Sequence, residues 1–422
     1  MPVNPFLLDL APRKCYYKTW IYMAVNLLLS IQQGSDSQMT VNEKALKLHE
    51  EWQGKIETKT KCSIKNREDL ALAYTPGVAE PCKVIAENKD AVYTYTSKAN
   101  TVAVVSDGSA VLGLGNIGAY AAMPVMEGKA ALFKAFGNVN AVPICLDTQD
   151  TEAIIQTVVN IAPAFGGINL EDIAAPRCFE IENRLKALLD IPVFHDDQHG
   201  TAIVVLAGII NGLRLTGKKK ENCKVVVNGA GSAGIAITRL LLNYGFKHIT
   251  MCDRHGIISK KYPELNWMQE EMTNYTNLEN KEGTLADAMK GADVFVGVSA
   301  PGIVSEAMVA SMNSDAILFA MANPVPEIMP DIARGAGARV VGTGRSDFPN
   351  QVNNVAAFPG IFKGALEGHA RQITETMKLA AATALADLVS DEELNEDFIM
   401  PDPFDPRIVD VVADAVKANI EK

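Results

Sequence analysis

A glycine-rich turn between an apolar strand and a helix constrains the fold of this chain more than any other feature. Residues 224–228 (KVVVN) form a short apolar run, and the pattern IAITRLLLNYG, typical of a helix, begins at residue 235. The motif between them consists of Gly229, Ala230, Gly231, Ser232, Ala233 and Gly234. Asp253 ends the next apolar run, 19 residues after Gly234. A GxGxxG motif alone is weak evidence, but this context predicts a Rossmann-like unit in which residues 229–234 bind a dinucleotide.

The three glycines of this motif have different expected roles. Gly229 allows a tight turn, Gly231 lets the backbone approach a pyrophosphate, and Gly234 permits close packing of the helix on the strand. The N-terminus of the helix also offers unpaired N–H groups to a phosphate. The alternative is a glycine-rich turn that binds no ligand, and the strand and helix on either side argue against it.

The residues after the second strand bear on the choice of nucleotide. The Asp253 carboxylate would accept hydrogen bonds from a ribose diol and repel a 2′-phosphate, which favours NAD. Arg254 favours NADP, because a guanidinium can bind that phosphate, and Lys260 and Lys261 are close enough in sequence to assist. The choice is nearly even, with a slight preference for NADP.

The rest of the chain alternates between apolar runs and helical patterns. After residue 223, the runs VVVNG, ITMCD, DVFVGVS, AILFAMANP and ARVVGTG are separated by helical or looped connections. This order predicts an α/β protein with a mostly parallel, doubly wound sheet. We expect an N-terminal α/β domain over residues 39–205, an NAD(P)-binding domain over 206–362 and a helical segment over 363–422. Within the last segment, residues 364–389 are expected to form one long helix, and another helix follows Pro406.

Residues 1–38 differ from the rest of the sequence. Basic residues precede a short apolar run at residues 19–31, which is similar to a signal peptide but too short to span a bilayer and without an evident cleavage site. Seven scattered cysteines with no CxxC pair are typical of reduced thiols. We therefore expect a cytoplasmic protein in which residues 1–38 are an extension outside the fold. The net charge of −11 argues against nucleic acid or a membrane surface as a partner.

Two acidic pairs suggest a metal site. Glu171-Asp172 and Asp196-Asp197 are 24 residues apart, and the second pair follows the apolar run IPVFH. Such pairs usually lie on a solvated surface, but carboxylates at the end of an apolar strand need a cation to balance them. A set of oxygen ligands would suit Mg²⁺ or Mn²⁺. His195 and His199 flank the second pair, but imidazole prefers softer metals, so we do not expect either to be a ligand.

Several blocks of sequence resemble the malic enzyme family, in the family's order, over about residues 41 to 380. They are YTPGVA, SDGSAVLGLGNIG, PVMEGKAALFK, GGINLEDI, FHDDQHGTA, ANPVPEI and NNVAAFPG. The length is similar to that of the short, bacterial-type members. The resemblance implies an N-terminal malic-enzyme domain, a Rossmann-like NAD(P) domain and C-terminal helices.

The resemblance also implies roles for individual residues. By it, the metal ligands are Glu171, Asp172 and Asp197. Lys129 matches the general base, Tyr74 the general acid, and Asp196 would lie beside Lys129 and affect its charge. Asn323 and Asn354 match asparagines that hold the malate carboxylate, and Asn323 is also expected near the cofactor. In larger members an arginine stands where this chain has Ala110, so the substrate anion must be held by other groups.

Taken singly, these residues have ordinary explanations. A lysine among alanines and leucines, such as Lys129, usually extends from a helix to solvent. Tyr74 before Thr-Pro-Gly would usually pack on a turn, and Asn323 and Asn354 are typical loop residues. The resemblance, rather than the single residues, favours the catalytic interpretation.

The family's reaction converts L-malate and NAD(P)⁺ to pyruvate, CO₂ and NAD(P)H with Mg²⁺ or Mn²⁺, and its members commonly share residues across an interface, which implies a homodimer. A lysine base must start neutral, so its pKa has to fall from about 10.4. Burial and a nearby dication would lower it, whereas Asp196 would raise it. The rival interpretations are a malolactic-type enzyme that retains its NAD, a metal-free 2-hydroxyacid dehydrogenase, and a nucleotide-binding sensor without turnover.

Overall fold

The computed structural model describes residues 39–421, so the predicted extension over residues 1–38 lies outside the described part. The chain divides into two units, Met1–Glu57 and Thr58–Lys422. In the first unit, the helix α2 (Val41–Trp52) begins at Thr40, whose side chain accepts the N–H of Glu43 while the Glu43 carboxylate accepts the N–H of Thr40. This reciprocal capping box fixes the start of the helix.

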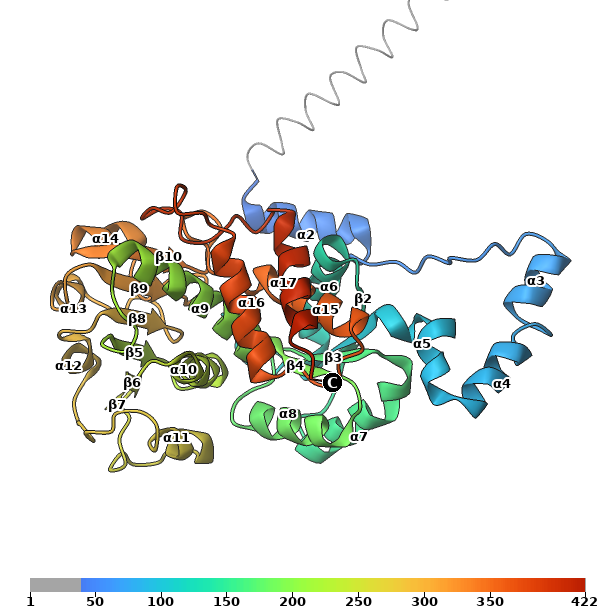
Figure 1. Ribbon diagram of the computed structural model, residues 1–422, viewed down its shortest axis with the longest axis horizontal. Coiled ribbons are helices and arrows are strands. Elements are labelled where there is room, and N and C mark those ends of the chain that lie inside the picture. The colour runs from blue at the N-terminus through green and yellow to red at the C-terminus, as the bar shows by residue number, and fades with distance from the viewer. Residues whose placement is uncertain (1–38, 422) are drawn as a thin grey trace, which may run out of the picture. The chain divides into compact units, whose positions relative to one another are not determined.

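The second unit contains two sheets, one parallel and one mostly parallel (Figure 1). The first has the strand order β2-β1-β3-β4, and all its neighbours are parallel. Its strands are β1 (Thr101–Ser106), β2 (Asn140–Cys145), β3 (Gly167–Leu170) and β4 (Val193–His195). Every residue of β1 is buried, as expected for a central strand covered on both faces.

The second sheet has the order β10-β9-β8-β5-β6-β7, and only the pair β6 and β7 is antiparallel. Its strands are β5 (Lys224–Asn228), β6 (His248–Asp253), β7 (Gly256–Ile257), β8 (Val294–Gly297), β9 (Ala316–Ala320) and β10 (Ala338–Thr343). Strand order reverses at β5, which lies between β6 and β8. The predicted α/β class and doubly wound sheet are confirmed.

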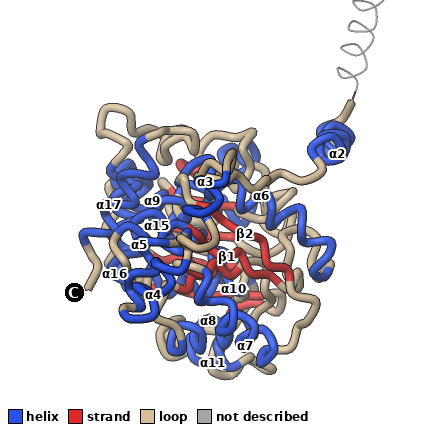
Figure 2. Tube along the Cα trace, turned by 90° about the vertical axis from the view of Figure 1, so that its right-hand side faces the viewer, coloured by secondary structure: helices blue, strands red, loops and turns tan. Residues whose placement is uncertain are grey.

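Helices enclose these strands in Figure 2. The α-helices of the second unit are α3 (Arg67–Ala73), α4 (Ala79–Glu87), α5 (Val92–Tyr95), α6 (Gly118–Gly137), α7 (Thr151–Ile161), α8 (Arg177–Leu188), α9 (Asp196–Thr216), α10 (Ser232–Tyr244), α11 (Trp267–Met272), α12 (Leu285–Met289), α13 (Glu306–Ala310), α14 (Pro330–Gly335), α15 (Phe358–Glu367), α16 (Glu375–Asp387) and α17 (Arg407–Ala418). Short 3-10 helices are η1 (Lys89–Ala91), η2 (Ser97–Asn100), η3 (Ala162–Ala164) and η4 (Asn354–Ala356).

The helix α9 connects the two sheets. Its side chains belong to a core that also contains Val104 of β1, Val227 of β5 and Phe362 of α15. Every residue from Ala202 to Leu213 is buried, so this stretch of the helix is covered on all sides. Among the described residues it is the one helix long and apolar enough to cross a membrane, and most of it is buried inside the protein. Its first two residues are Asp196 and Asp197, so the acidic pair is anchored by this core.

The prediction of one long helix over residues 364–389 is wrong. The helix α15 ends at Glu367 and α16 begins at Glu375. Thr374 starts the second helix, because its side chain accepts the N–H of Met377. The local capping signal at Thr374 therefore overrides a continuous helical pattern. The helix expected after Pro406 is α17.

Candidate active site

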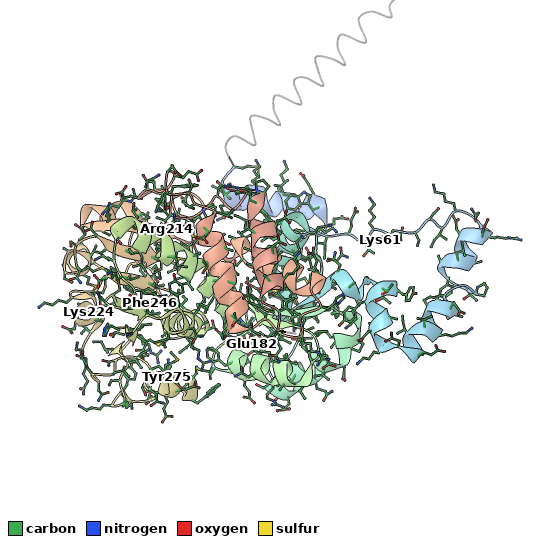
Figure 3. All side chains as sticks on the ribbon, viewed as in Figure 1. Lys61, Glu182, Arg214, Lys224, Phe246 and Tyr275 are labelled. Carbon is green, nitrogen blue, oxygen red and sulfur yellow. The ribbon has the colours of Figure 1, made fainter. Side chains whose placement is uncertain are left out.

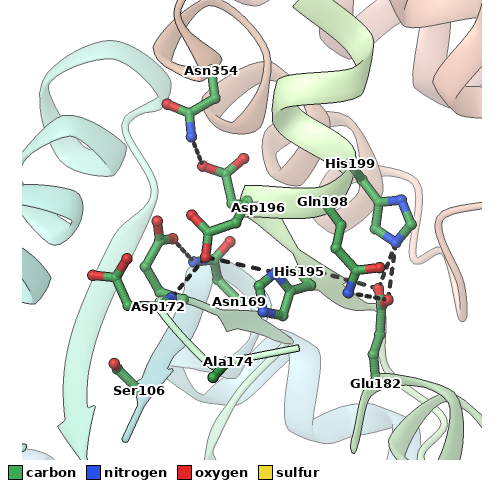
Figure 4. A network of polar contacts seen from close by, with 12 residues as sticks. Ser106, Asn169, Asp172, Ala174, Glu182, His195, Asp196, Gln198, His199 and Asn354 are labelled. Carbon is green, nitrogen blue, oxygen red and sulfur yellow. Dashed lines mark hydrogen bonds and ion pairs between the residues drawn. The ribbon is translucent and has the colours of Figure 1, made fainter. Parts of the chain in front are cut away.

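Acidic residues meet at the carboxyl edge of the first sheet. Glu171 and Asp172 directly follow β3, and Asp196 and Asp197 directly follow β4. The two strands are parallel neighbours, with Leu170 paired to His195. Because parallel strands end at the same edge, the two acidic pairs are brought side by side (Figure 4).

Three of these residues form a carboxylate cluster: Glu171, Asp172 and Asp197. One oxygen from each lies within 4.8 Å of the others. Asp197 Oδ2 accepts the N–H of Asp172 at 2.8 Å, and the Asp172 carbonyl accepts the N–H of Ala110 at 2.9 Å. Asp172 has a φ of 54°, a left-handed conformation that costs a non-glycine residue about 1–3 kcal/mol. These contacts hold the strained backbone of Asp172 in place.

The electrostatics of the carboxylate cluster fit a cation. Burial, reinforced by the charges of Asp197 and Glu171, raises the pKa of Asp172 to about 9. Burial also raises the pKa of Asp197 to about 6, and it raises the pKa of Glu171. Asp172 Oδ2 is buried and has no hydrogen-bond partner. A hard dication would relieve both the repulsion and the orphaned oxygen, so this set of oxygens suits Mg²⁺ or Mn²⁺.

Lys129 reaches the cluster from α6. Its Nζ lies 2.6 Å from Asp196 Oδ2 and 3.0 Å from Glu171 Oε1, and 4.2 Å above the ring of Phe358. Burial alone would lower the pKa of Lys129, but Asp196 and Glu171 raise it above the ordinary lysine value. These two ion pairs favour the ammonium form of Lys129.

Asp196 connects Lys129 to Asn354. Asn354 Nδ2 donates to Asp196 Oδ2 at 2.6 Å, so the amide and the ammonium share one carboxylate oxygen. Burial raises the pKa of Asp196 to about 7, and the charge of Lys129 opposes this rise. The structure thus brings Lys129, Asp196 and Asn354 together beside the carboxylate cluster.

The glycine loop lies between β5 and α10. Gly229 has a φ of 116°, and a Cβ there would lie 2.5 Å from the carbonyl oxygen of Val298. A Cβ on Gly234 would lie 1.7 Å from the carbonyl oxygen of Gly229, whereas nothing lies within 4 Å of the Cβ position of Gly231. Gly231 precedes a 13-residue helix with no side-chain cap at its N-terminus. Packing therefore requires glycine at positions 229 and 234. Gly231 leaves open space beside the unpaired N–H groups of the helix, as a pyrophosphate needs.

A cavity of about 1170 Å³ opens over this loop. Besides Gly229, Ala230 and Gly231, its lining includes Asp253, Arg254, Lys261, Tyr262 and Glu282. Asp253 ends β6, as the sequence predicts, and Arg254 and His255 form the tip of the antiparallel turn to β7. The loop and the acid are thus parts of one cavity large enough for a dinucleotide.

Comparisons with known proteins decide the family. The family model "Malic enzyme, N-terminal domain" matches residues 53–186, and "Malic enzyme, NAD binding domain" matches residues 198–417. The chain belongs to the malic enzyme family. This confirms the family resemblance expected from the sequence motifs.

Individual relatives of the family are similar over most of the chain. The bifunctional malic/malolactic enzyme of Bacillus subtilis (strain 168) is 58% identical, with 91% of this chain and 94% of that protein covered. The NAD-dependent malic enzyme of Geobacillus stearothermophilus is 60% identical, over 86% of this chain and 76% of that protein. The crystal structure of the NAD-dependent malic enzyme from Thermotoga maritima has a TM-score of 0.85 at 51% identity, with 88% and 98% of the two chains covered.

Tyr74 and Asn323, which the malic enzyme resemblance also assigns to the site, come from two other segments of the chain. Tyr74 follows α3 and is 67% exposed, and α3 and α4 stand apart from the sheets (Figure 1). Asn323 lies close to Gly113 and Gly344, at the loop that contains Ala110. The carboxylate cluster contains neither His195 nor His199.

The sequence reasoning missed a buried carboxylate behind this malic enzyme site. Glu182 of α8 accepts the N–H of His195 at 3.2 Å and contacts His199 Nε2 at 2.8 Å (Figures 3 and 4). Burial would raise the pKa of Glu182, but His199 and Lys186 hold it well below the ordinary value. Glu182 therefore secures the turn that carries Asp196. Its only local signal is the spacing of Glu182 and Lys186, which is common on surface helices.

Proposed function

We propose that this chain oxidatively decarboxylates L-malate to pyruvate and CO₂ while reducing NAD⁺ or NADP⁺. The observation that carries the proposal is the carboxylate cluster with Lys129 Nζ 3.0 Å from Glu171, in a chain whose second half contains an open glycine loop. Close relatives with the names NAD-dependent and malic/malolactic enzyme support the same substrate.

Glu171, Asp172 and Asp197 are the residues that would hold Mg²⁺ or Mn²⁺. Such an ion, when bound, polarises the hydroxyl and carbonyl oxygens of the substrate and stabilises negative charge on them. The protein holds Glu171 and Asp172 buried and Asp197 partly exposed, which keeps the three charges close together.

Lys129 is proposed as the base that takes the proton of the C2 hydroxyl while the C2 hydride moves to the nicotinamide. The C3–C4 bond then breaks, CO₂ leaves, and the resulting enol takes a proton at C3. Glu171 is both a neighbour of Lys129 and a member of the carboxylate cluster. When a cation occupies that carboxylate, its effect on Lys129 weakens, so the pKa of Lys129 falls toward the neutral form that a base requires.

Tyr74 is proposed to protonate the enol from a second copy of the chain in a homodimer. Tyr74 is exposed, and so are its apolar neighbours Leu70 and Leu72 and, in the loop after Ala110, Leu112 and Leu114. Exposed apolar side chains around a proton donor suit a surface that another copy covers. Asn323 is proposed as a contact of substrate and cofactor, from its place at the loop of Gly113.

Mixing two inactive variants tests this sharing of residues. If Tyr74 acts across the dimer, a heterodimer of Tyr74→Phe and Lys129→Ala contains one complete site. After unfolding and refolding of an equal mixture, activity should return to about a quarter of the wild-type value, since half the dimers are mixed. No recovery, with mixed dimers present, would contradict the proposal.

The relative from Bacillus subtilis favours one second candidate, a malolactic reaction. In that case the nucleotide is reduced and reoxidised within one turnover, so lactate and CO₂ appear without net NADH. Product analysis with L-malate and Mn²⁺ separates the two functions. Pyruvate in equal amount to reduced nucleotide supports the proposed function, and lactate as the main product supports the second candidate.

A further inference from the structure

The contacts of Asp253 bear on the choice between NAD and NADP, because this residue is expected at the adenosine ribose, where the two nucleotides differ. Asp253 Oδ1 accepts the N–H of His255 at 2.8 Å and the hydroxyl of Tyr262. Both hydrogen bonds that the described residues make to this carboxylate end on Oδ1. Oδ2 therefore remains for the two hydroxyls of an adenosine ribose, and the carboxylate has a fixed orientation.

Tyr262 is suited to hold this carboxylate in place. Its side chain is half-buried and lines the same cavity as Asp253, and its ring meets that of His255 edge-on at a centroid distance of 6.2 Å. Burial and the hydrogen bond to Asp253 raise the pKa of Tyr262 above the ordinary tyrosine value. The hydroxyl is thus protonated at neutral pH and acts as a permanent donor.

The cations that a 2′-phosphate would need have other contacts. Lys261 Nζ lies 2.8 Å from Glu282 Oε1, and Glu282 also lines the cavity. Arg254 Nε lies 2.9 Å from His255 Nε2. A phosphate would therefore meet a fixed carboxylate and would have to break the Lys261 pair. That pair is exposed, so its contribution is small beside that of Asp253.

We infer that Tyr262 is a positioning residue for nucleotide choice, which holds Asp253 so that the protein prefers NAD to NADP. The inference rests on the proposed function only in that the nucleotide is the proposed oxidant. It differs from the slight preference for NADP that the sequence favours, because the sequence does not show that Tyr262 and Glu282 face the site. Without the Tyr262 hydroxyl, the His255 N–H is the one remaining described donor to Asp253, so the carboxylate is held less firmly and can turn to admit a 2′-phosphate beside Arg254.

Binding of NADH and NADPH to the full chain tests this inference without turnover. The wild-type protein should bind NADH more tightly, and Tyr262→Phe should reduce the ratio of the two affinities by ~10-fold, since one hydrogen bond to a charged group is lost. Tyr275→Phe is the matched control. Tyr275 is exposed in the same domain and outside the cavity lining, so the ratio should not change (Figure 3).

A double-mutant cycle shows whether Tyr262 acts through Asp253. In the Asp253→Ala background, Tyr262→Phe should have no further effect on the ratio. A wild-type preference for NADPH, an equal loss of both affinities in Tyr262→Phe, or a persisting effect in that background would overturn the inference. Loss of malate turnover with the expected binding ratios would count against the proposed function alone.

Discussion

The carboxylate cluster of the first sheet and the glycine loop of the second bind by different means. The cluster consists of carboxyl side chains that two adjacent parallel strands bring together, and its function depends on their number and spacing. The glycine loop contributes backbone and open space, and its selectivity depends on the half-buried pair Asp253 and Tyr262. Changes at the cluster should therefore abolish chemistry, whereas changes at the loop should alter affinities and ratios.

The largest expected effect is at Lys129. Lys129→Ala removes the proposed base and should lower kcat by about 10²–10⁴-fold, while NADH binding stays as in the wild type because Lys129 is outside the nucleotide cavity. Steady-state rates with L-malate and a parallel NADH titration measure both quantities. Lys134→Ala, on the exposed side of the same helix, is the control. Near-normal turnover in Lys129→Ala would remove it from the mechanism.

The next effect concerns the carboxylate cluster itself. Asp197→Asn removes one of three carboxylates and should raise the Mn²⁺ concentration for half-maximal activity by ~10-fold or more. Asp190→Asn, an exposed position just before β4, should leave the Mn²⁺ titration unchanged. An unchanged titration in Asp197→Asn would exclude that residue as a ligand.

Two glycines of the loop should respond differently, Gly231 in nucleotide affinity and Gly234 in stability. Gly231→Ala places a Cβ in open space, so folding is unaffected, but the methyl group enters the path of a pyrophosphate and should weaken NADH binding by ~10-fold. Gly234→Ala instead meets the Gly229 carbonyl and should lower the melting temperature. If Gly231→Ala bound NADH normally, the loop would not be the pyrophosphate site.

The smallest expected effect is on the pH dependence of thermal stability, which the carboxylate cluster should influence and the glycine loop should not. Asp172 and Asp197 have pKa values of about 9 and about 6, both raised by burial, whereas in the unfolded chain they titrate near ~4. Between roughly pH 4 and 9 the folded protein therefore binds more protons than the unfolded one, so stability is present at low pH and lost as pH rises. In metal-free buffer, Tm should therefore fall by a few degrees as the pH rises, because each kcal/mol of lost stability lowers Tm by ~2–4 °C.

Two comparisons check the origin of this slope. Excess Mn²⁺ should flatten the dependence of Tm on pH and raise Tm, since the ion binds the folded state. Asp172→Asn should also have a shallower slope in metal-free buffer. A metal-free Tm that rises from pH 5 to 8, in both wild type and variant, would mean that the cluster does not control stability in this range.

The sequence predicted best what depends on local pattern. Gly229, Gly231 and Asp253 lie where a strand, a turn and a helix in order must place them, and the acidic pairs meet because each follows a parallel strand. The charge of Lys129 could not be predicted, because burial and the carboxylates act in opposite directions and only the structure gives their distances.

Contacts between residues far apart in the sequence could not be predicted either, because only the structure shows which side chains meet. Glu182 touches residues 13 and 17 positions away, and Tyr262 meets Asp253 across a turn whose geometry no motif specifies. Tyr74 was expected in the site from family resemblance alone, and within one chain it is exposed. A contact from a second copy of the chain is therefore part of the proposal and not of the described structure.

The most direct test of the account is the absorbance of reduced nicotinamide in parallel mixtures of the protein with L-malate and Mn²⁺, one with NAD⁺ and one with NADP⁺. The account predicts a rising signal with pyruvate as product, faster with NAD⁺, and no signal when the metal is chelated. Malate consumption without net reduction of either nucleotide, or no consumption at all, would contradict it.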